Sequence, residues 1–231
     1  MPASISIVIP TLNAARHLAG STNALLEGVT DGLVSELVIS DGGSTDETRD
    51  AARELGAVWV EGPSGRGGQL ARGVAAAKSH WVLLLHADTW LSAGWPAAAA
   101  RHMNLHPESA GWFRLKFRAD GLMPRLVEYG ANRRAQVLGL PYGDQGLLIS
   151  QKLLADVGGI PVLPLMEDVA LARRLKGKLR PLAADAITSA ERYERDGWFR
   201  RPVQNIGTLM RYFMGADLNR LKERYERKAH R

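Results

Sequence analysis

The stretch Trp81-Val82-Leu83-Leu84-Leu85-His86-Ala87-Asp88-Thr89 decides the fold. Its first five residues are apolar without polar alternation, which is typical of a strand buried on both faces in the parallel sheet of an α/β protein. The run then breaks into His86 and Asp88, two positions apart, at the carboxyl end of the predicted strand. Open α/β sheets bind ligands at that end, and a carboxylate there can hold a divalent metal against phosphate oxygens. We therefore expect a phosphate-containing ligand at this place.

The composition is that of an ordinary globular protein. The chain has 231 residues, 45% hydrophobic and 23% charged, which fits one large domain or one domain with an appendage. It has no cysteine, which excludes disulfides, thiolate nucleophiles and cysteine-based zinc sites and suits a cytoplasmic protein. The N-terminal residues lack a basic segment followed by a long apolar segment, so we expect a first strand there and not a signal peptide.

The excess positive charge is concentrated at the C-terminal end. Residues 192–231 hold 11 Lys/Arg and 5 Asp/Glu, whereas residues 1–191 hold 19 of each, so the whole net charge of +6 lies in the tail. We expect a catalytic-type domain over 1–191 and a basic helical extension over 192–231. Most of these charges are expected on a solvated helical face. The tail has no recognisable nucleic-acid-reading module, so no nucleic-acid partner is expected.

Strands and helices alternate over the first half of the chain, which predicts a mixed, mainly parallel sheet flanked by helices. Ser44 or Thr45 is expected to cap the helix that follows the second strand. After residue 110 the apolar runs are less regular, and antiparallel additions are expected. The predicted strands are 5–9, 36–40, 57–61, 81–85, 111–118 and 146–150. The predicted helices are 14–26, 46–55, 69–78, 151–157, 167–175, 202–214 and 218–228.

Polar side chains follow the predicted strands at one edge of the sheet, where nucleotide and phosphate sites usually form. They are Thr11 and Asn13, Asp41, the Gly/Arg-rich loop 62–68, and Asp88. Taken singly each is weak, because Asp41 can be a turn residue and the loop a plain connection. The loop is not a P-loop, because no Gly-Lys-Ser/Thr follows, and it is not a dinucleotide fingerprint, because its glycine spacing is wrong and it does not follow the first strand. Arg66 and Arg72 can pair with phosphate, although Arg72 is equally compatible with an ordinary surface position.

Four motifs in order resemble the family 2 glycosyltransferases of the GT-A fold, over about residues 4–185. A Leu-His-Ala-Asp-Thr run with Gly143-Asp144-Gln145-Gly146 also resembles a subgroup labelled arsenosugar-biosynthesis or radical-SAM/selenodomain-associated glycosyltransferases. That label carries little information on substrate. The four motifs are Ile7-Val8-Ile9-Pro10-Thr11-Leu12-Asn13, Ile39-Ser40-Asp41-Gly42-Gly43-Ser44-Thr45-Asp46-Glu47-Thr48, Leu85-His86-Ala87-Asp88, and Val157-Gly158-Gly159 followed by Met166-Glu167-Asp168-Val169-Ala170-Leu171-Ala172-Arg173-Arg174-Leu175.

The resemblance implies an inverting transferase of the hexosyltransferase type that moves one sugar from a UDP- or GDP-sugar to an acceptor, which is a small molecule or lipid-linked. It also implies residue roles. Pro10, Thr11 and Asp41 hold the base and ribose, and Asn13 belongs to the same motif. Asp88 binds Mn²⁺ or Mg²⁺ at the donor diphosphate, and Glu167-Asp168 supplies a general base, usually the Asp. The simpler interpretation of the Glu-Asp pair is an acidic helix N-terminus.

The departures from the family pattern leave alternatives open. His86 stands where the first Asp of an Asp-x-Asp motif is usual, so it is a metal ligand, a hydrogen-bonding group or a packed strand-end residue. Asp144 and Gln145 are expected on the acceptor side, or in a polar turn. The Gln-x-x-Arg-Trp motif of processive members is absent, which favours single-sugar transfer. A non-catalytic nucleotide- or partner-binding protein and a sugar nucleotidyltransferase are the alternatives.

The predicted helix 202–214 admits its own alternatives. It can lie on the inner face of the membrane as a peripheral contact, or pack on the core or on a second subunit of a homodimer. Because Ile206, Met210 and Phe213 form only a narrow apolar stripe, we expect packing.

Overall fold

The structure is a computed structural model that describes residues 4–229, with side chains up to residue 224. Its strands are β1 (Ile5–Thr11), β2 (Val34–Asp41), β3 (Val58–Glu61), β4 (Trp81–Leu84), β5 (Thr89–Leu91), β6 (Ala110–Phe117), β7 (Leu147–Ser150) and β8 (Leu179–Thr188). Its helices are α1 (Ala15–Asn23), α2 (Leu26–Thr30), α3 (Thr48–Glu54), α4 (Arg66–Ala76), α5 (Trp95–Leu105), α6 (Leu122–Leu138), α7 (Gln151–Asp156), α8 (Glu167–Arg174), α9 (Glu191–Asp196), α10 (Arg200–Phe213) and α11 (Leu218–Ala229), with a 3₁₀ turn η1 (Gly143–Gln145).

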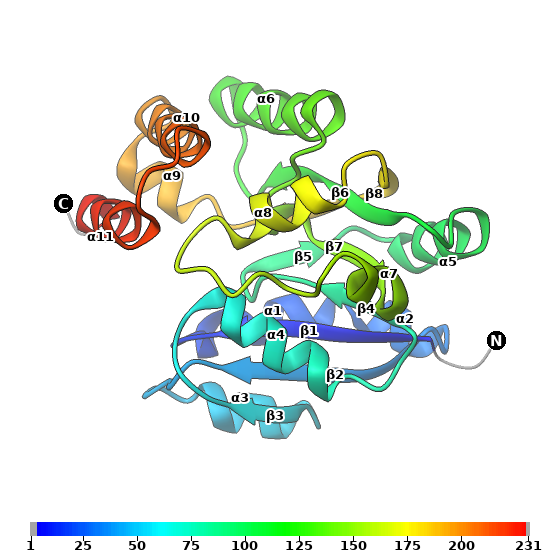
Figure 1. Ribbon diagram of the computed structural model, residues 1–231. Coiled ribbons are helices and arrows are strands. Elements are labelled where there is room, and N and C mark those ends of the chain that lie inside the picture. The colour runs from blue at the N-terminus through cyan, green and yellow to red at the C-terminus, as the bar shows by residue number, and fades with distance from the viewer. Residues whose placement is uncertain (1–3, 230–231) are drawn as a thin grey trace.

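The strands form a single mixed sheet in the order β3-β2-β1-β4-β7-β6-β8-β5 (Figure 1). Strands β3, β2, β1 and β4 are mutually parallel, as is the pair β6 and β8, while β7 runs antiparallel to β4 and β6, and β5 antiparallel to β8. The predicted α/β class and the mixed, mainly parallel sheet flanked by helices are confirmed.

Burial on both faces explains why β1 is mainly apolar. In β1, Ile5, Ile7 and Ile9 pack on one face with Leu18 and Trp95, from α1 and α5. Val8 points to the other face, where it joins the cluster that includes residues of α4, α7 and α8. The register pairs Thr11 with Asp41, so the carboxyl ends of β1 and β2 lie together.

Several local predictions are wrong in detail. The expected helix 14–26 ends earlier, because α1 stops at Asn23, and a separate helix α2, which was not predicted, begins at Leu26. Helix α3 begins at Thr48 with Glu47 at its N-cap, so neither Ser44 nor Thr45 caps it, because the Ser44 hydroxyl is donated to Asp41. Helix α4 begins at Arg66, inside the stretch expected to be a loop. The other elements not predicted are α5, α6, β5, β8, η1 and α9.

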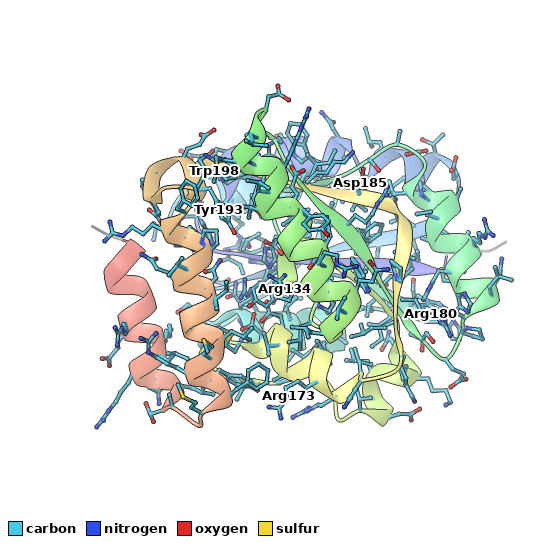
Figure 2. The ribbon with its side chains drawn as sticks, turned by 90° about the horizontal axis from the view of Figure 1, so that it is seen from above. Arg134, Arg173, Arg180, Asp185, Tyr193 and Trp198 are labelled. Atoms are coloured by element: carbon cyan, nitrogen blue, oxygen red, sulfur yellow. The ribbon has the colours of Figure 1, made fainter. Side chains whose placement is uncertain are left out.

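The C-terminal helices continue directly from the sheet. Helix α9 starts at Glu191, so the expected domain boundary after residue 191 falls inside a helix. Tyr193 of α9 stacks on Trp198, with ring centroids 5.1 Å apart (Figure 2). Both rings meet Phe117 of β6 edge-on. No helix within residues 4–229 is both long and apolar enough to cross a bilayer.

The apolar stripe of α10 does not pack on the core, which corrects our expectation for this helix. Val203, Ile206 and Met210 are all more than half exposed. The helix packs instead through its opposite face, where Arg201 and Thr208 are buried. Homodimer contact through this stripe remains a prediction.

Candidate active site

Two adjoining cavities lie at the carboxyl ends of β1 and β4. The larger, of about 440 Å³, is lined by six of the predicted residues, Pro10, Thr11, Asn13, Arg66, His86 and Asp88. The smaller, of about 120 Å³, is lined by Asp88, Asp144 and Asp168 among others. Asp88, His86 and Arg66 line both, so the two cavities form one continuous site. The larger volume is typical of a small-molecule pocket.

One wall of the larger cavity is built by Asn13 and the loop that follows β2. Asn13 adopts a left-handed backbone conformation with φ of 51°, which asparagine tolerates better than most residues. Its side-chain oxygen accepts a 2.8 Å hydrogen bond from the backbone amide of Thr45. The backbone amide of Asn13 donates to the Ser44 hydroxyl, also at 2.8 Å. Asn13 therefore fixes the β2–α3 loop against the end of β1 as well as lining the cavity.

Asp41 lies behind this wall and is 1% exposed. One carboxylate oxygen accepts from the Gly43 and Ser44 amides, at 2.8 and 2.7 Å, and the other accepts from the hydroxyls of Thr11 and Ser44, at 2.8 and 2.6 Å. Burial opposes its ionisation, but these hydrogen bonds outweigh burial and lower the pKa of Asp41. Both oxygens are thus engaged within the protein, and Asp41 shapes the loop without lining either cavity.

The two predicted arginines occupy different environments. Arg66, the first residue of α4, pairs through Nε with Glu167, and its Nη2 lies 4.0 Å from Asp168. Arg72 instead donates to the carbonyl oxygens of Pro63 and Asp41, at 2.8 and 3.4 Å, and does not line either cavity. Arg66 therefore belongs to the site, whereas Arg72 supports the backbone beneath it.

His86 is neutral in this structure. Its Nε2 lies 3.2 Å from Arg66 Nη1, and because a guanidinium only donates, Nε2 accepts and the proton belongs on Nδ1. Burial, and then the positive charge of Arg66, lower the pKa of His86 to about 4 against the opposing charge of Asp88. The lone pair of Nε2 is engaged by Arg66, so His86 is not arranged as a metal ligand.

Asp88 follows β4 at the junction of the two cavities. Its carbonyl oxygen accepts a 2.9 Å hydrogen bond from Arg118, whose guanidinium lies 4.2 Å from the ring centre of Trp90. Arg118 was not predicted, since nothing in the sequence connects residue 118 to the end of β4. This contact fixes the Asp88 backbone and leaves its carboxylate facing the cavities.

The predicted Glu-Asp pair divides into a buried and an accessible residue. Glu167 is 3% exposed and held by Arg66, and burial is the main cause of its raised pKa, with Arg66 opposing. Asp168 lines the smaller cavity, and its Oδ2 accepts a 2.9 Å hydrogen bond from the Gly143 amide. The Asp is therefore placed to meet a ligand, whereas Glu167 positions Arg66.

The 3₁₀ turn places its two predicted residues differently. Asp144 lines the smaller cavity, and its Oδ1 is buried without a hydrogen-bond partner among the described residues. Burial raises the pKa of Asp144 to about 6, with Arg134 opposing and the negative charges of Asp168 and Asp88 adding to the rise. Gln145 is fully buried and bonds the carbonyl of Phe113, so it holds the turn and does not reach the cavity.

Residues beyond 191 also line the site, which sequence reasoning missed because they lie in the basic extension. Arg192 borders both cavities and has no hydrogen-bond or ion-pair partner among the side chains that the structure describes. Arg201 and Asn205 of α10 border the smaller cavity, and Arg201 pairs with Asp196 at 2.9 Å. The C-terminal extension is thus part of the site.

The protein side chains at this site suit a metal that is coordinated mainly by a bound phosphate compound. The described residues contain no group of three His, Asp or Glu side chains arranged as a ready metal cage. Asp88 contributes one carboxylate where the two cavities meet. Asp144, whose Oδ1 has no hydrogen-bond partner among the described residues, lines the smaller cavity. Mg²⁺ is commonly bound by one or two carboxylates together with phosphate oxygens and water, so Asp88 with a diphosphate fits this coordination.

Comparison with known families identifies the chain. The family described as "Glycosyl transferase family 2" matches residues 6–156, well over half of the sequence. The chain belongs to this family. The match covers β1 to α7, and thus Asp41, Asp88 and Asp144, whereas Asp168 and the C-terminal helices lie beyond it.

Solved structures share the fold of this family 2 glycosyl transferase. The S. aureus TarS 1–349 structure in complex with UDP superposes with a TM-score of 0.65 at 17% identity, covering 80% of this chain and 60% of that one. Glucosyl-3-phosphoglycerate synthase from Mycobacterium tuberculosis, in complex with Mn²⁺ and UDP-glucose, gives a TM-score of 0.56 at 20% identity, covering 81% and 70%. The chain therefore spans about three-fifths of the TarS fragment. No curated protein matches this family 2 glycosyl transferase significantly.

Proposed function

We propose that this protein transfers a single hexose from a UDP- or GDP-sugar to an acceptor hydroxyl, with inversion at the anomeric carbon. The observation that carries the proposal is the convergence of Asp88 and Asp168, 80 positions apart in sequence, on one cavity that opens into a larger groove. The fold supports it, because structures with this fold were obtained with UDP and with Mn²⁺ and UDP-glucose.

The larger cavity is the proposed donor site. Pro10, Thr11 and Asn13 border the part in which the nucleoside would lie, and Asp41 acts as a positioning residue through Thr11 and the β2–α3 loop. The diphosphate would lie at the junction, within reach of Arg66 and Arg192. Guanidinium groups suit this task because they donate in a planar fork that matches phosphate oxygens.

A divalent metal, Mn²⁺ or Mg²⁺, would be held by Asp88 and would supply neutralisation of the diphosphate charge. His86 supports this arrangement without ligating the metal, since its Nε2 accepts from Arg66 and thereby orients that guanidinium.

Asp168 is the proposed general base. It would take the proton of the acceptor hydroxyl as the oxygen bonds to the anomeric carbon. The bond from that carbon to the diphosphate oxygen breaks at the same time, and the electron pair leaves with the diphosphate. The Gly143 amide, 2.9 Å from Asp168 Oδ2, holds the carboxylate in place, and the other oxygen accepts a hydrogen bond from the Val169 amide of its own helix turn.

The smaller cavity is the proposed acceptor side. Asp144 borders it with a carboxyl group whose pKa of about 6 leaves it ready to donate or accept a hydrogen bond near neutral pH. We assign Asp144 to orienting an acceptor hydroxyl, while Gln145 keeps the turn in position from behind.

The test measures nucleoside diphosphate release and sugar transfer with a panel of UDP- and GDP-sugars, with Mn²⁺ or Mg²⁺. Asp168→Asn should lower turnover by about a hundredfold or more, because a general base is lost. Donor binding measured by calorimetry should be retained. Asp88→Asn should weaken metal-dependent donor binding. Asp120→Asn is the matched control, because Asp120 is exposed and borders neither cavity. Unchanged turnover in Asp168→Asn would remove the proposed mechanism.

A non-catalytic nucleotide-binding protein is the second candidate, and the engagement of His86 by Arg66 favours it, since the described residues hold no group of three His, Asp or Glu side chains arranged for a metal. It predicts calorimetric UDP binding without turnover of any donor, either by transfer or by hydrolysis.

A further inference from the structure

Helix α10 carries an apolar stripe that faces away from the protein. At 100° per residue, Phe199 just before the helix, Val203, Ile206, Met210, Phe213 and Met214 fall within an arc of about 100°. All six are between 49% and 77% exposed. Six large apolar side chains on one helix face form a patch, whereas single exposed apolar residues would need no explanation.

The opposite face of the same helix attaches it to the domain. Arg201, Asn205 and Thr208 lie about half a turn around the helix from the stripe, and Arg201 and Thr208 are buried. Arg201 and Asn205 border the smaller cavity. Arg173 of α8 lies at the helix end, with its guanidinium 5.9 Å from the ring centre of Tyr212 and 5.2 Å from that of Phe213, which at 49% is the least exposed residue of the stripe. One side of α10 is thus a wall of the site and the other is an apolar surface.

Positive charge lies beside the stripe. Arg200 and Arg211 follow the stripe along one flank of the helix, at about 120° and 140° on the wheel that places Ile206 at zero. Arg220 and Arg224 of α11 are exposed on the neighbouring helix. Residues 192–231 carry the whole net charge of +6. An exposed apolar face flanked by arginine is the pattern of a helix that lies in the plane of an anionic membrane surface.

Helix α6 is a second helix with exposed apolar side chains. Figures 1 and 2 both place α6 beside α10. It carries its own exposed apolar row, Leu122, Leu126, Tyr129 and Val137, together with exposed Arg125 and Arg133. Apolar and basic groups therefore recur together on two neighbouring helices.

We propose that the α10 stripe docks on an anionic lipid bilayer, with the helix parallel to the surface and its arginines at the headgroups. Charge complementarity selects this occupant, because a second copy of the chain would bring the same net-positive tail against itself. Docking does not depend on the proposed function. If that function holds, docking places the acceptor cavity next to the bilayer surface and favours a lipid-linked acceptor hydroxyl.

The test is co-sedimentation of the full chain with vesicles of phosphatidylcholine alone or with about 30% phosphatidylglycerol, which supplies the anionic surface. The variant Val203→Ser/Ile206→Ser/Met210→Ser removes the centre of the stripe. Its matched control, Leu26→Ser/Val29→Ser/Leu105→Ser, removes three similarly exposed side chains of α2 and α5, at the opposite end of the molecule in Figure 1. A second variant, Arg200→Gln/Arg211→Gln, leaves the stripe intact.

The wild-type chain and the α2/α5 control should pellet with anionic vesicles. The stripe variant should bind the anionic vesicles at least about tenfold more weakly. A tenfold change in affinity corresponds to only about 1.4 kcal/mol, and the variant loses three apolar side chains. The arginine variant should lose binding to anionic vesicles selectively. Equal pelleting of the stripe variant and its control, or no pelleting of the wild type, would overturn the proposal. Light scattering that shows a dimer abolished by the stripe variant, without vesicle binding, would assign the stripe to a second copy instead.

Discussion

Asp144→Asn should stabilise the protein, by an amount that grows with pH. An unfolded chain ionises this carboxyl near its ordinary pKa of 3.8, whereas burial holds the folded pKa at about 6. Ionisation is therefore easier in the unfolded state, and the wild-type free energy of unfolding falls as the pH rises through this window. The full difference corresponds to about 3 kcal/mol above pH 6, since one pKa unit is about 1.4 kcal/mol.

Asparagine is neutral at every pH and does not undergo this loss. The difference in pKa therefore makes the free energy of unfolding of the variant larger than that of the wild type by about 1 kcal/mol at pH 4.5 and about 3 kcal/mol at pH 8. Any change in packing adds a contribution that does not depend on pH. Urea unfolding of both proteins at the two pH values, in metal-free buffer with chelator, measures the difference of about 2 kcal/mol, from which the packing term cancels. Stability curves that run parallel from pH 4.5 to 8 would refute the assignment of a buried, unpartnered carboxyl at this position.

Two further substitutions test how the site is held together. Gly143→Ala should lower the turnover of the donor in a steady-state assay by about tenfold or more, because a Cβ there would lie 2.5 Å from His86 Nε2. The control Gly130→Ala places its Cβ in open space on α6 and should leave that turnover unchanged. Arg66→Ala should lower the free energy of unfolding by about 3 kcal/mol at pH 8, because it leaves Glu167 buried without its cation. Adding Glu167→Gln should recover part of that loss in urea titrations, and a double variant no more stable than Arg66→Ala would contradict the pairing.

Strands β1 and β4 could be predicted because both are buried on both faces of the sheet. Residues 81–85 form a continuous apolar run, and residues 5–9 are apolar except for Ser6; the structure packs alternate apolar side chains of each on opposite faces of the sheet. Strand β8 has no such signal, since it contains Pro181 and exposes several positions near its start. Helix α6 was missed although its buried positions, Pro124, Ala131 and Ala135, follow helical spacing, because these residues are small or helix-breaking and give little apolar periodicity.

Motif order selected residues that the structure gathers around the two cavities, but it could not separate residues that line a cavity from residues that support it. Asp41, Glu167 and Gln145 carry polar groups at predicted positions, yet each is buried and engaged by neighbouring protein groups. That distinction depends on which amides and guanidinium groups face each side chain, which local sequence does not encode. Arg192 shows the converse, because its place at both cavities depends on how α9 follows β8.

A crystal structure of the protein with UDP and Mn²⁺ tests the central claim most directly. The account predicts the uridine in the larger cavity beside Thr11 and Asn13, the metal between Asp88 and the diphosphate, and the β-phosphate pointing toward the cavity that contains Asp168. Nucleotide bound away from Asp88, or with Asp168 turned away from the β-phosphate, would contradict it.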